Sequence, residues 1–152
     1  MTVPESHLGT DLWLLRNLEH QAGRDRGADL LVGEDEPHDL LTVTGNENLA
    51  QALLLRFLTP QGELSVLGHP DYGSRLYELI GELNDVTNRN RARMYVLQAL
   101  AAEPRVAKVS SLQVTQALDR VGVLVDMTLE VIDSDTPLNL VFPFSFEGGA
   151  TP

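Results

Sequence analysis

The sequence predicts an α+β fold in which a three-stranded antiparallel meander near the C-terminal end packs against two main helices. Two observations carry this prediction. Apolar residues recur every three to four positions in residues 45–58 and 91–105, which is typical of helices with a buried stripe. Beyond Pro104 they alternate with polar residues, which is typical of strands with one buried face. We also expect a short N-terminal helix and small accessory strands.

A chain of 152 residues has the size of one ordinary domain. We expect a single domain with four parts: an N-terminal helix and acidic loop (1–42), a helical part (43–105), a β meander (106–147) and a tail (148–152). The absence of cysteine excludes disulfides, thiol catalysis and thiolate metal sites. No apolar run approaches the roughly 18 residues of a membrane span, and the first residues lack a signal-peptide pattern. We therefore expect a soluble protein, made in the cytoplasm, with no membrane insertion.

The net charge of −11 argues against a protein that binds the phosphate backbone of nucleic acid. Acidic residues gather at both ends of the chain, whereas residues 47–118 are balanced. A solvated surface that keeps the protein in solution and a surface complementary to a basic partner both fit this distribution.

The N-terminal third predicts a helix, a loop and a strand. The helix spans Leu8 to Leu18, because leucines recur there at helical spacing. Residues 20–39 are rich in glycine and charge, which predicts a loop. A short strand is expected at residues 39–43.

The next helix begins at Gly45 and Asn46 and is apolar on nearly every face, interrupted only by Gln51 and Arg56. Arg56 should therefore reach an edge, a carboxylate or another chain, and it is a candidate partner contact. A turn at residues 59–62 leads into a brief strand at 63–67 whose Leu64 and either Val66 or Leu67 point inward. Ser74 is then expected to cap a short helix with an apolar stripe of Leu76, Leu79, Ile80 and Leu83.

The helix of residues 91–105 should bury a stripe that includes Met94, Leu97, Leu100 and Ala101. Pro104 ends it, because proline lacks the backbone donor and disfavours helix in the residue before it. Glu103 is unusual at this position, since a carboxylate faces the negative end of the helix dipole. The charges of Glu103 and Arg105 would be costly or idle in a monomer, which predicts that a neighbouring chain satisfies them.

The meander consists of strands at residues 106–118, 121–132 and 138–146, with a hairpin turn at Asp119 and Arg120. Pro143 cannot donate a ladder bond and therefore confines the last strand to a sheet edge. The acidic, glycine-rich end of the chain protects this edge, or a strand from another chain covers it. The apolar residues of this last strand are Leu138, Leu140, Phe142, Phe144 and Phe146.

Catalysis has weak support in the sequence. A catalytic group could be formed by His69, Asp71 and Tyr72, but a hydrogen-bonded turn explains these residues better. The carboxylate pairs Glu63 with Asp71 and Glu78 with Glu82 suit a glycosidase no better than any acidic protein does. No histidine pair has i, i+4 spacing and no glycine-rich phosphate loop occurs, so we expect no metal, no cofactor and no enzymatic activity.

Four segments, taken in order, point to a known family. They are LGTDL at 8–12, VTGNENLAQALLLRFLTPQGEL at 43–64, HPDYGSRL at 69–76 and AAEPRV at 101–106 before a meander. This set resembles the sheath-initiator family of contractile tails, the lysozyme-like baseplate wedge proteins of contractile phages. Relatives occur in type VI secretion and extracellular contractile injection systems. The tripeptide Glu103-Pro104-Arg105 is the family's best-known mark.

The resemblance implies a structural component of a baseplate. Six copies would sit around the tube, dock on wedge proteins and offer a sheet edge to sheath subunits, with inner tube or hub proteins as further candidate partners. Glu103 and Arg105 would contact the wedge, although an internal cap between helix and strand is the alternative. A lysozyme-like enzyme and an unrelated soluble adaptor remain alternative functions. Phage, tailocin, secretion system and extracellular injector are equally open.

Overall fold

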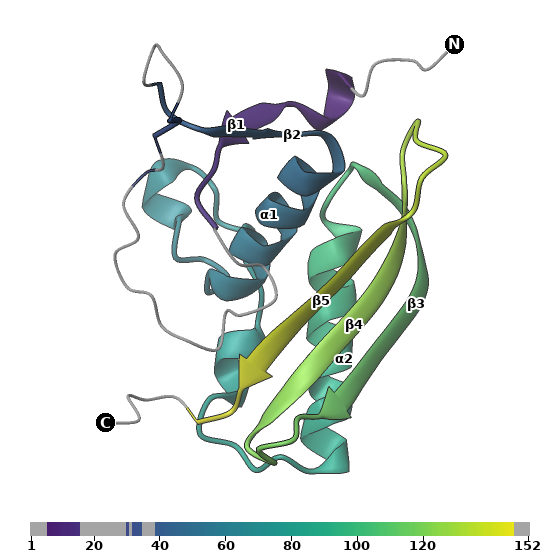
Figure 1. Cartoon of the computed structure of the whole chain (residues 1–152). Coiled ribbons are helices and arrows are strands. Elements are labelled where there is room, and N and C mark those ends of the chain that lie inside the picture. Colours follow the sequence, from purple (N-terminus) through teal and green to yellow (C-terminus); the bar gives the residue numbers. More distant parts are fainter. Residues whose placement is uncertain (1–5, 16–29, 31, 35–38, 148–152) are drawn as a thin grey trace.

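The structure is a computed structural model that describes residues 6–15, 30, 32–34 and 39–147. These residues form one three-stranded sheet, one small two-stranded sheet and two α-helices (Figure 1). The expected α+β fold is therefore confirmed. The helices are α1 (Gly45–Leu58) and α2 (Val86–Ala101), with three short 3-10 helices η1 (Ser6–Leu8), η2 (Ser65–Leu67) and η3 (Leu76–Leu79). The strands are β1 (Thr10–Leu12), β2 (Thr42–Thr44), β3 (Val106–Gln116), β4 (Gly122–Val131) and β5 (Leu138–Ser145).

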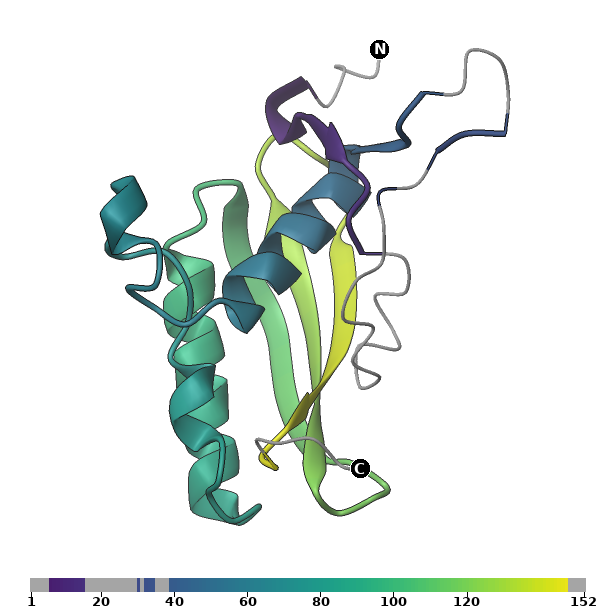
Figure 2. The same cartoon turned by 90° about the vertical axis from the view of Figure 1, so that its left-hand side faces the viewer.

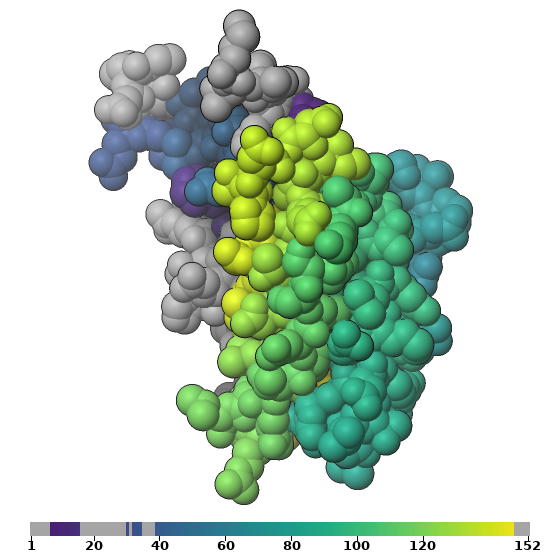
Figure 3. All heavy atoms as spheres, turned by 90° about the vertical axis from the view of Figure 1, so that its right-hand side faces the viewer, coloured from purple at the N-terminus to yellow at the C-terminus, as the bar shows by residue number. Residues whose placement is uncertain are grey.

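The larger sheet has the order β3-β4-β5 with antiparallel pairing throughout, as the alternating pattern predicts. Odd-numbered residues of β4 from 123 to 131 are buried, whereas most even-numbered ones are exposed. Both helices pack on the buried face, α2 along β3 and α1 across β5 (Figure 2). The rings of Phe57 in α1 and Phe142 in β5 stack with centroids 5.1 Å apart. No described helix lies on the opposite face of the sheet (Figure 1), and Figure 3 shows the green and yellow residues of the sheet with the teal residues of the helical part to one side.

The predicted helix at residues 8–18 is wrong. Leu8 ends η1, residues 10–12 form a strand antiparallel to β2, and residues 16–18 lie outside the described part. The side chain of Gln51 explains the difference: it accepts from the backbone N–H groups of Leu14 and Leu15 and donates to the carbonyl of Leu12. A side chain of α1 thus satisfies the backbone groups that a helix would have paired internally.

The strand predicted at residues 39–43 is shifted. Leu40 makes only an isolated bridge to Val32, and the strand itself is β2, three residues later than expected at its start. Most of the predicted loop at 20–39 lies outside the described residues.

The brief strand predicted at residues 63–67 is also wrong. Hydrogen bonds between residues three apart close this segment into turns and η2, so its backbone is satisfied locally. Val66 and Leu67, one of which was expected to point inward, are 92% and 69% exposed.

The short helix after Ser74 is a single 3-10 turn. The hydroxyl of Ser74 accepts from Leu76 N, so Ser74 does support the start of this turn. Leu76 and Leu79 are buried as predicted, but Ile80 and Leu83 are exposed. The chain leaves the helix at Gly81, where φ is +91° and the N–H donates to the carbonyl of Phe146.

Helix α2 begins five residues earlier than the predicted one. The carboxylate of Asp85 caps it by accepting from Asn88 N at 2.8 Å. Its buried stripe contains Tyr95, Val96 and Leu100, whereas Met94 and Ala101, which were predicted to be buried, are exposed. No helix in the described ranges is long and apolar enough to cross a bilayer.

Within the described part of the chain β5 pairs with β4 alone, so it is an edge strand of this sheet, as Pro143 predicts. Leu138, Leu140 and Phe142 are buried on its inner face, and Phe144 is half-buried. Phe146, just beyond the strand, is buried as well.

Candidate functional site

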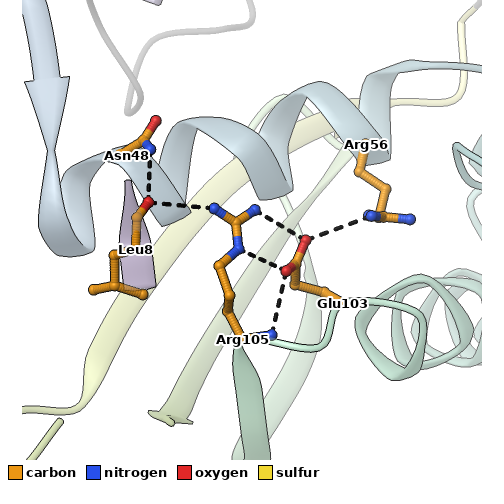
Figure 4. A network of polar contacts seen from close by, with 5 residues as sticks. All are labelled: Leu8, Asn48, Arg56, Glu103 and Arg105. Atoms are coloured by element: carbon orange, nitrogen blue, oxygen red, sulfur yellow. Dashed lines mark hydrogen bonds and ion pairs between the residues drawn. The ribbon is translucent and has the colours of Figure 1, made fainter. Parts of the chain in front are cut away.

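The junction between α2 and β3 contains a carboxylate that is almost completely buried (Figure 4). Helix α2 ends at Ala101, and Glu103 follows with only 4% of its surface exposed. Pro104 then forces the chain out of the helix, and β3 begins at Val106. A buried charge of this kind is stable only where partners compensate for the lost water.

Arg105 supplies most of that compensation. Its Nε lies 2.7 Å from Oε1 of Glu103 and its Nη2 lies 3.1 Å from Oε2, so the guanidinium holds the carboxylate with two parallel bonds. The backbone N–H of Arg105 also donates to Oε1, at 3.3 Å. Nη2 of Arg56, from α1, lies 3.4 Å from Oε2. The carboxylate therefore joins both helices to the first strand of the sheet.

The network keeps Glu103 ionised at neutral pH. Burial alone would raise the pKa of the Glu103 carboxyl, but the hydrogen bonds from Arg105 and the charges of Arg105 and Arg56 outweigh burial and lower that pKa. The hydrogen bond to Glu103 raises the pKa of Arg105. Both groups are therefore charged throughout the physiological range.

The N-terminal segment joins the same network through a backbone carbonyl. The oxygen of Leu8 accepts from Nδ2 of Asn48 at 2.8 Å and from Nη1 of Arg105 at 3.5 Å (Figure 4). No residue type marks this acceptor in the sequence, because every residue carries a backbone carbonyl.

Arg56 lies between an acid and an aromatic ring. Its guanidinium carbon sits 4.6 Å from the ring centroid of Tyr72, which is cation–π geometry. Its Nε is buried and has no hydrogen-bond partner among the described residues. The sequence predicts that Arg56 reaches an edge, a carboxylate or another chain. In the structure it reaches the carboxylate of Glu103.

Glu103 and Arg105 pair with each other within the chain, as the alternative of an internal cap requires, so their charges do not depend on a neighbouring chain for compensation. Contact with a partner stays a prediction. Arg105 keeps 26% of its side chain exposed, and Pro104 is exposed beside it.

The candidate catalytic residues are either exposed or held by other side chains. His69 and Asp71 are exposed, while Tyr72 lies against Arg56. Glu78 accepts two hydrogen bonds from Arg75, which lower the pKa of its carboxyl, whereas a glycosidase acid needs a raised pKa. The part of the chain that the structure describes has no group of three or more potential metal ligands among His, Cys, Asp and Glu.

No strand among residues 6–15, 30, 32–34 and 39–147 pairs with the outer edge of β5, and this free edge is the second candidate site. The carbonyl of Gly122, in β4, accepts from Ala117 N on the side of β3. Successive residues of a strand point their backbone N–H and C=O groups to opposite sides. The even-numbered residues of β4 therefore hydrogen-bond to β3, and the odd-numbered ones hydrogen-bond to β5. By the same alternation, Phe142 bonds toward β4, while the backbone of Asn139, Val141 and Pro143 faces outward. Pro143 therefore removes one N–H donor from the outer edge of β5 and removes no hydrogen bond between β5 and β4.

The free edge of β3 is built differently. Its pairing with β4 shifts register twice, between Val106 and Lys108 and between Val109 and Ser111. The outward carbonyl of Leu112 is occupied by Nε of Arg93, from α2, at 3.2 Å. Bulges and covering side chains are two ways in which proteins protect an edge from further pairing.

Comparisons with known proteins show which family and which solved structure this chain is similar to. A family model described as contractile injection system sheath initiator matches residues 24–134. A solved structure of a candidate tail lysozyme from Geobacter sulfurreducens is similar with a TM-score of 0.61 and 24% sequence identity. The similarity covers 71% of this chain and 96% of that one, and at this identity it shows the fold alone. No curated protein matches.

Proposed function

The chain belongs to the contractile injection system sheath initiator family, and we propose that it is a structural baseplate component that docks on the wedge and starts sheath polymerisation by β-strand addition. The observation that carries this proposal is the free edge of β5 in the three-stranded sheet. In this function the chain is made in the cytoplasm and assembles, in six copies, into the baseplate of a phage tail or an injection particle. Inner tube or hub proteins are further candidate neighbours.

The backbone of β5 suits a strand from a sheath subunit. Its pairing with β4 runs from Leu138 to Ser145 without a register shift, so its outward groups are regularly spaced. Asn139 and Val141 each offer an N–H and a carbonyl, and Pro143 offers a carbonyl. Main-chain hydrogen bonds of this kind supply affinity in strand addition, independently of most side chains. The buried Leu138, Leu140 and Phe142 hold the template in place.

The Glu103-Pro104-Arg105 junction, with Arg56, is the proposed contact with the wedge. Arg105 is both half-exposed and fixed, because Glu103 holds two of its nitrogens. Its Nη1 is held weakly, 3.5 Å from the carbonyl of Leu8, and a partner acceptor can compete for it. A fixed guanidinium loses less conformational entropy on binding than a mobile one.

Substitution of Arg105 tests the docking contact. We expect Arg105→Ala and Arg105→Lys to abolish or strongly reduce recruitment to the wedge, because lysine cannot form the two parallel bonds. Arg89→Lys is the matched control, since Arg89 bonds to Asn84 within the chain. Recruitment is measured by copurification with wedge proteins, and melting temperatures identify variants that fail to fold. Normal sheath assembly with both Arg105 variants would contradict the docking role.

Two alternatives have simple tests. The structural neighbour is described as a candidate tail lysozyme, so clearance of a peptidoglycan suspension by the purified protein tests an enzymatic function. We expect none. A soluble adaptor unrelated to contractile tails would copurify with neither wedge nor sheath proteins, and that result would overturn the assignment.

A further inference from the structure

We propose that a pocket beside the Glu103-Pro104-Arg105 junction binds a lysine or arginine side chain of the docking partner. The identity of that partner as the wedge rests on the proposed function. The pocket has a volume of about 160 Å³ and lies between the last turns of α2 and the connection that leads into η3. It is lined by Gln61, Asp71, Gly73, Ser74, Arg75, Tyr95, Gln98, Ala99 and Ala102.

The guanidinium and hydroxyl donors of the lining bond within the chain. Arg75 makes two hydrogen bonds to Glu78, at 2.8 and 3.0 Å, and its guanidinium lies over the ring of Tyr95. The hydroxyl of Tyr95 donates to Glu78 as well, at 3.0 Å. Ser74 donates to the carbonyl of Phe57. The one cation of the lining is therefore neutralised, which leaves no free positive group for an anionic ligand.

The unoccupied polar groups of the lining favour a cation. Within the described part of the chain, the side chains of Gln61, Asp71 and Gln98 have no hydrogen-bond or ionic partner. They provide one carboxylate, which only accepts, and two amides whose oxygens can accept from an ammonium or a guanidinium. The carboxylate of Asp71 supplies the charge that discriminates against neutral and acidic side chains.

The remaining walls suit an aliphatic stem. Ala99 and Ala102 present methyl groups from the end of α2. Gly73 has φ of +110°, and an added Cβ would lie 2.5 Å from the carbonyl oxygen of Thr59, so this wall stays free of a side chain. Lysine and arginine bury their methylene stems against such surfaces while the charged head reaches polar groups.

Two residues of the pocket lining are chain neighbours of the proposed docking contact. Ala102 directly precedes Glu103, and Asp71 directly precedes Tyr72, whose ring lies under Arg56. A partner that contacts Arg105 through an acceptor can therefore place a basic side chain in the pocket. This arrangement recognises a partner surface that carries both an acceptor and a cation.

The ligand class is tested on the full-length protein without any partner, by NMR titration with the N-acetyl methylamides of arginine, lysine and glutamate. We expect the arginine or lysine compound to shift the backbone signals of Gln98, Ala99 and Ala102, and the glutamate compound to leave them unchanged. Asp71→Asn should weaken binding about five-fold. Asp135→Asn, a matched change in the exposed β4–β5 loop, should have no effect. Absence of shifts with both cations, equal shifts with glutamate, or unchanged affinity in Asp71→Asn would each overturn the inference.

A second variant fills the pocket without changing charge. Ala102 has helical backbone angles (φ −83°, ψ −6°) that leucine adopts freely, so Ala102→Leu should fold normally while it excludes the ligand. We expect this variant and Asp71→Asn to reduce copurification with the wedge. If both variants copurify like the wild type, the inference fails while the proposed function stands. If the cations bind the pocket but the wild type recruits no wedge protein, the proposed function fails instead.

Discussion

The two edges of the sheet differ although both strands pair with the same central strand. β5 pairs with β4 in one unbroken register, and its outward backbone groups have no described strand beside them. β3 shifts register twice, and Arg93 occupies one of its outward carbonyls. A sheet that must accept a strand at one edge benefits from protection at the other, since two open edges invite uncontrolled association.

The two edge strands also differ in how firmly they are held from the inside. Leu138, Leu140 and Phe142 of β5 are all buried, and Phe142 stacks on α1. On β3, Leu112 is buried, whereas Val109 and Val114 are only half-buried. The strand that serves as the proposed template is therefore the one that buries more apolar side chains.

The largest effect is expected from proline substitutions at the two free edges. Val141→Pro removes an outward N–H of β5 without breaking the ladder to β4, so it should abolish sheath initiation while the protein still folds. Gln116→Pro makes the corresponding change at the outward edge of β3 and should leave initiation intact. Electron microscopy of assembled sheaths and thermal melts of both variants provide the measurement. Equal loss of initiation in the two variants would remove the distinction between the edges.

Core truncations should show the same asymmetry in stability. Phe142→Ala removes a fully buried ring and should lower the free energy of unfolding by about 3–5 kcal/mol. Val109→Ala removes two methyl groups from a half-buried site of β3 and should cost about 1 kcal/mol. Urea denaturation of the two variants measures the difference. Similar losses would mean that both edges depend equally on the core.

The start of β3 depends on the Glu103 network, and this dependence should vary with pH. We expect Glu103→Gln to lower the free energy of unfolding by about 2 kcal/mol at pH 7, since Arg105 and Arg56 lose their counter-charge.

The pKa of Glu103 is lowered from its usual 4.5 in the folded state, so its contribution to stability is present above about pH 4.5. That contribution is lost as the pH falls through the folded pKa. Urea denaturation from pH 7 to pH 3 should therefore show a steeper loss in the wild type than in Glu103→Gln. Parallel curves would mean that Glu103 does not contribute.

The smallest effect is expected from Arg93→Gln, which frees the carbonyl of Leu112. Because that group can turn to water, the loss of stability should stay below about 1 kcal/mol. Faster amide hydrogen exchange along β3, with β5 unchanged, would show that Arg93 covers this edge. Unchanged exchange would show that the bulges alone protect it.

Several of these features could be predicted from the sequence because their causes are local. The spacing of the apolar residues changes at Pro104, which locates the boundary between the helix and the meander. Pro143 identifies an edge strand. Arg56 stands out as a lone cation in an apolar helix, which is the signal that it has a buried partner. Arg105 is only two residues from Glu103, so their mutual pairing could also have been anticipated.

The errors arise where distant groups satisfy the backbone. The leucines from Leu8 to Leu18 have helical spacing, but Gln51 satisfies part of this segment from another element. The carbonyl of Leu8 completes the Glu103 network without any side-chain signal. The protection of β3 by Arg93 likewise depends on how α2 lies on the sheet, which spacing alone does not reveal.

Amide hydrogen exchange on the full-length protein, with and without synthetic peptides of the sheath subunit's terminal segments, tests the proposed template most directly. The amides of Asn139 and Val141 face outward in the free protein, so strand addition should slow their exchange by about ten-fold or more. The amide of Phe142, which faces β4, should be protected in both states. Slower exchange of the amides of Val114 and Gln116 on β3 instead, or peptide binding without slower exchange on β5, would contradict the proposal that β5 is the template.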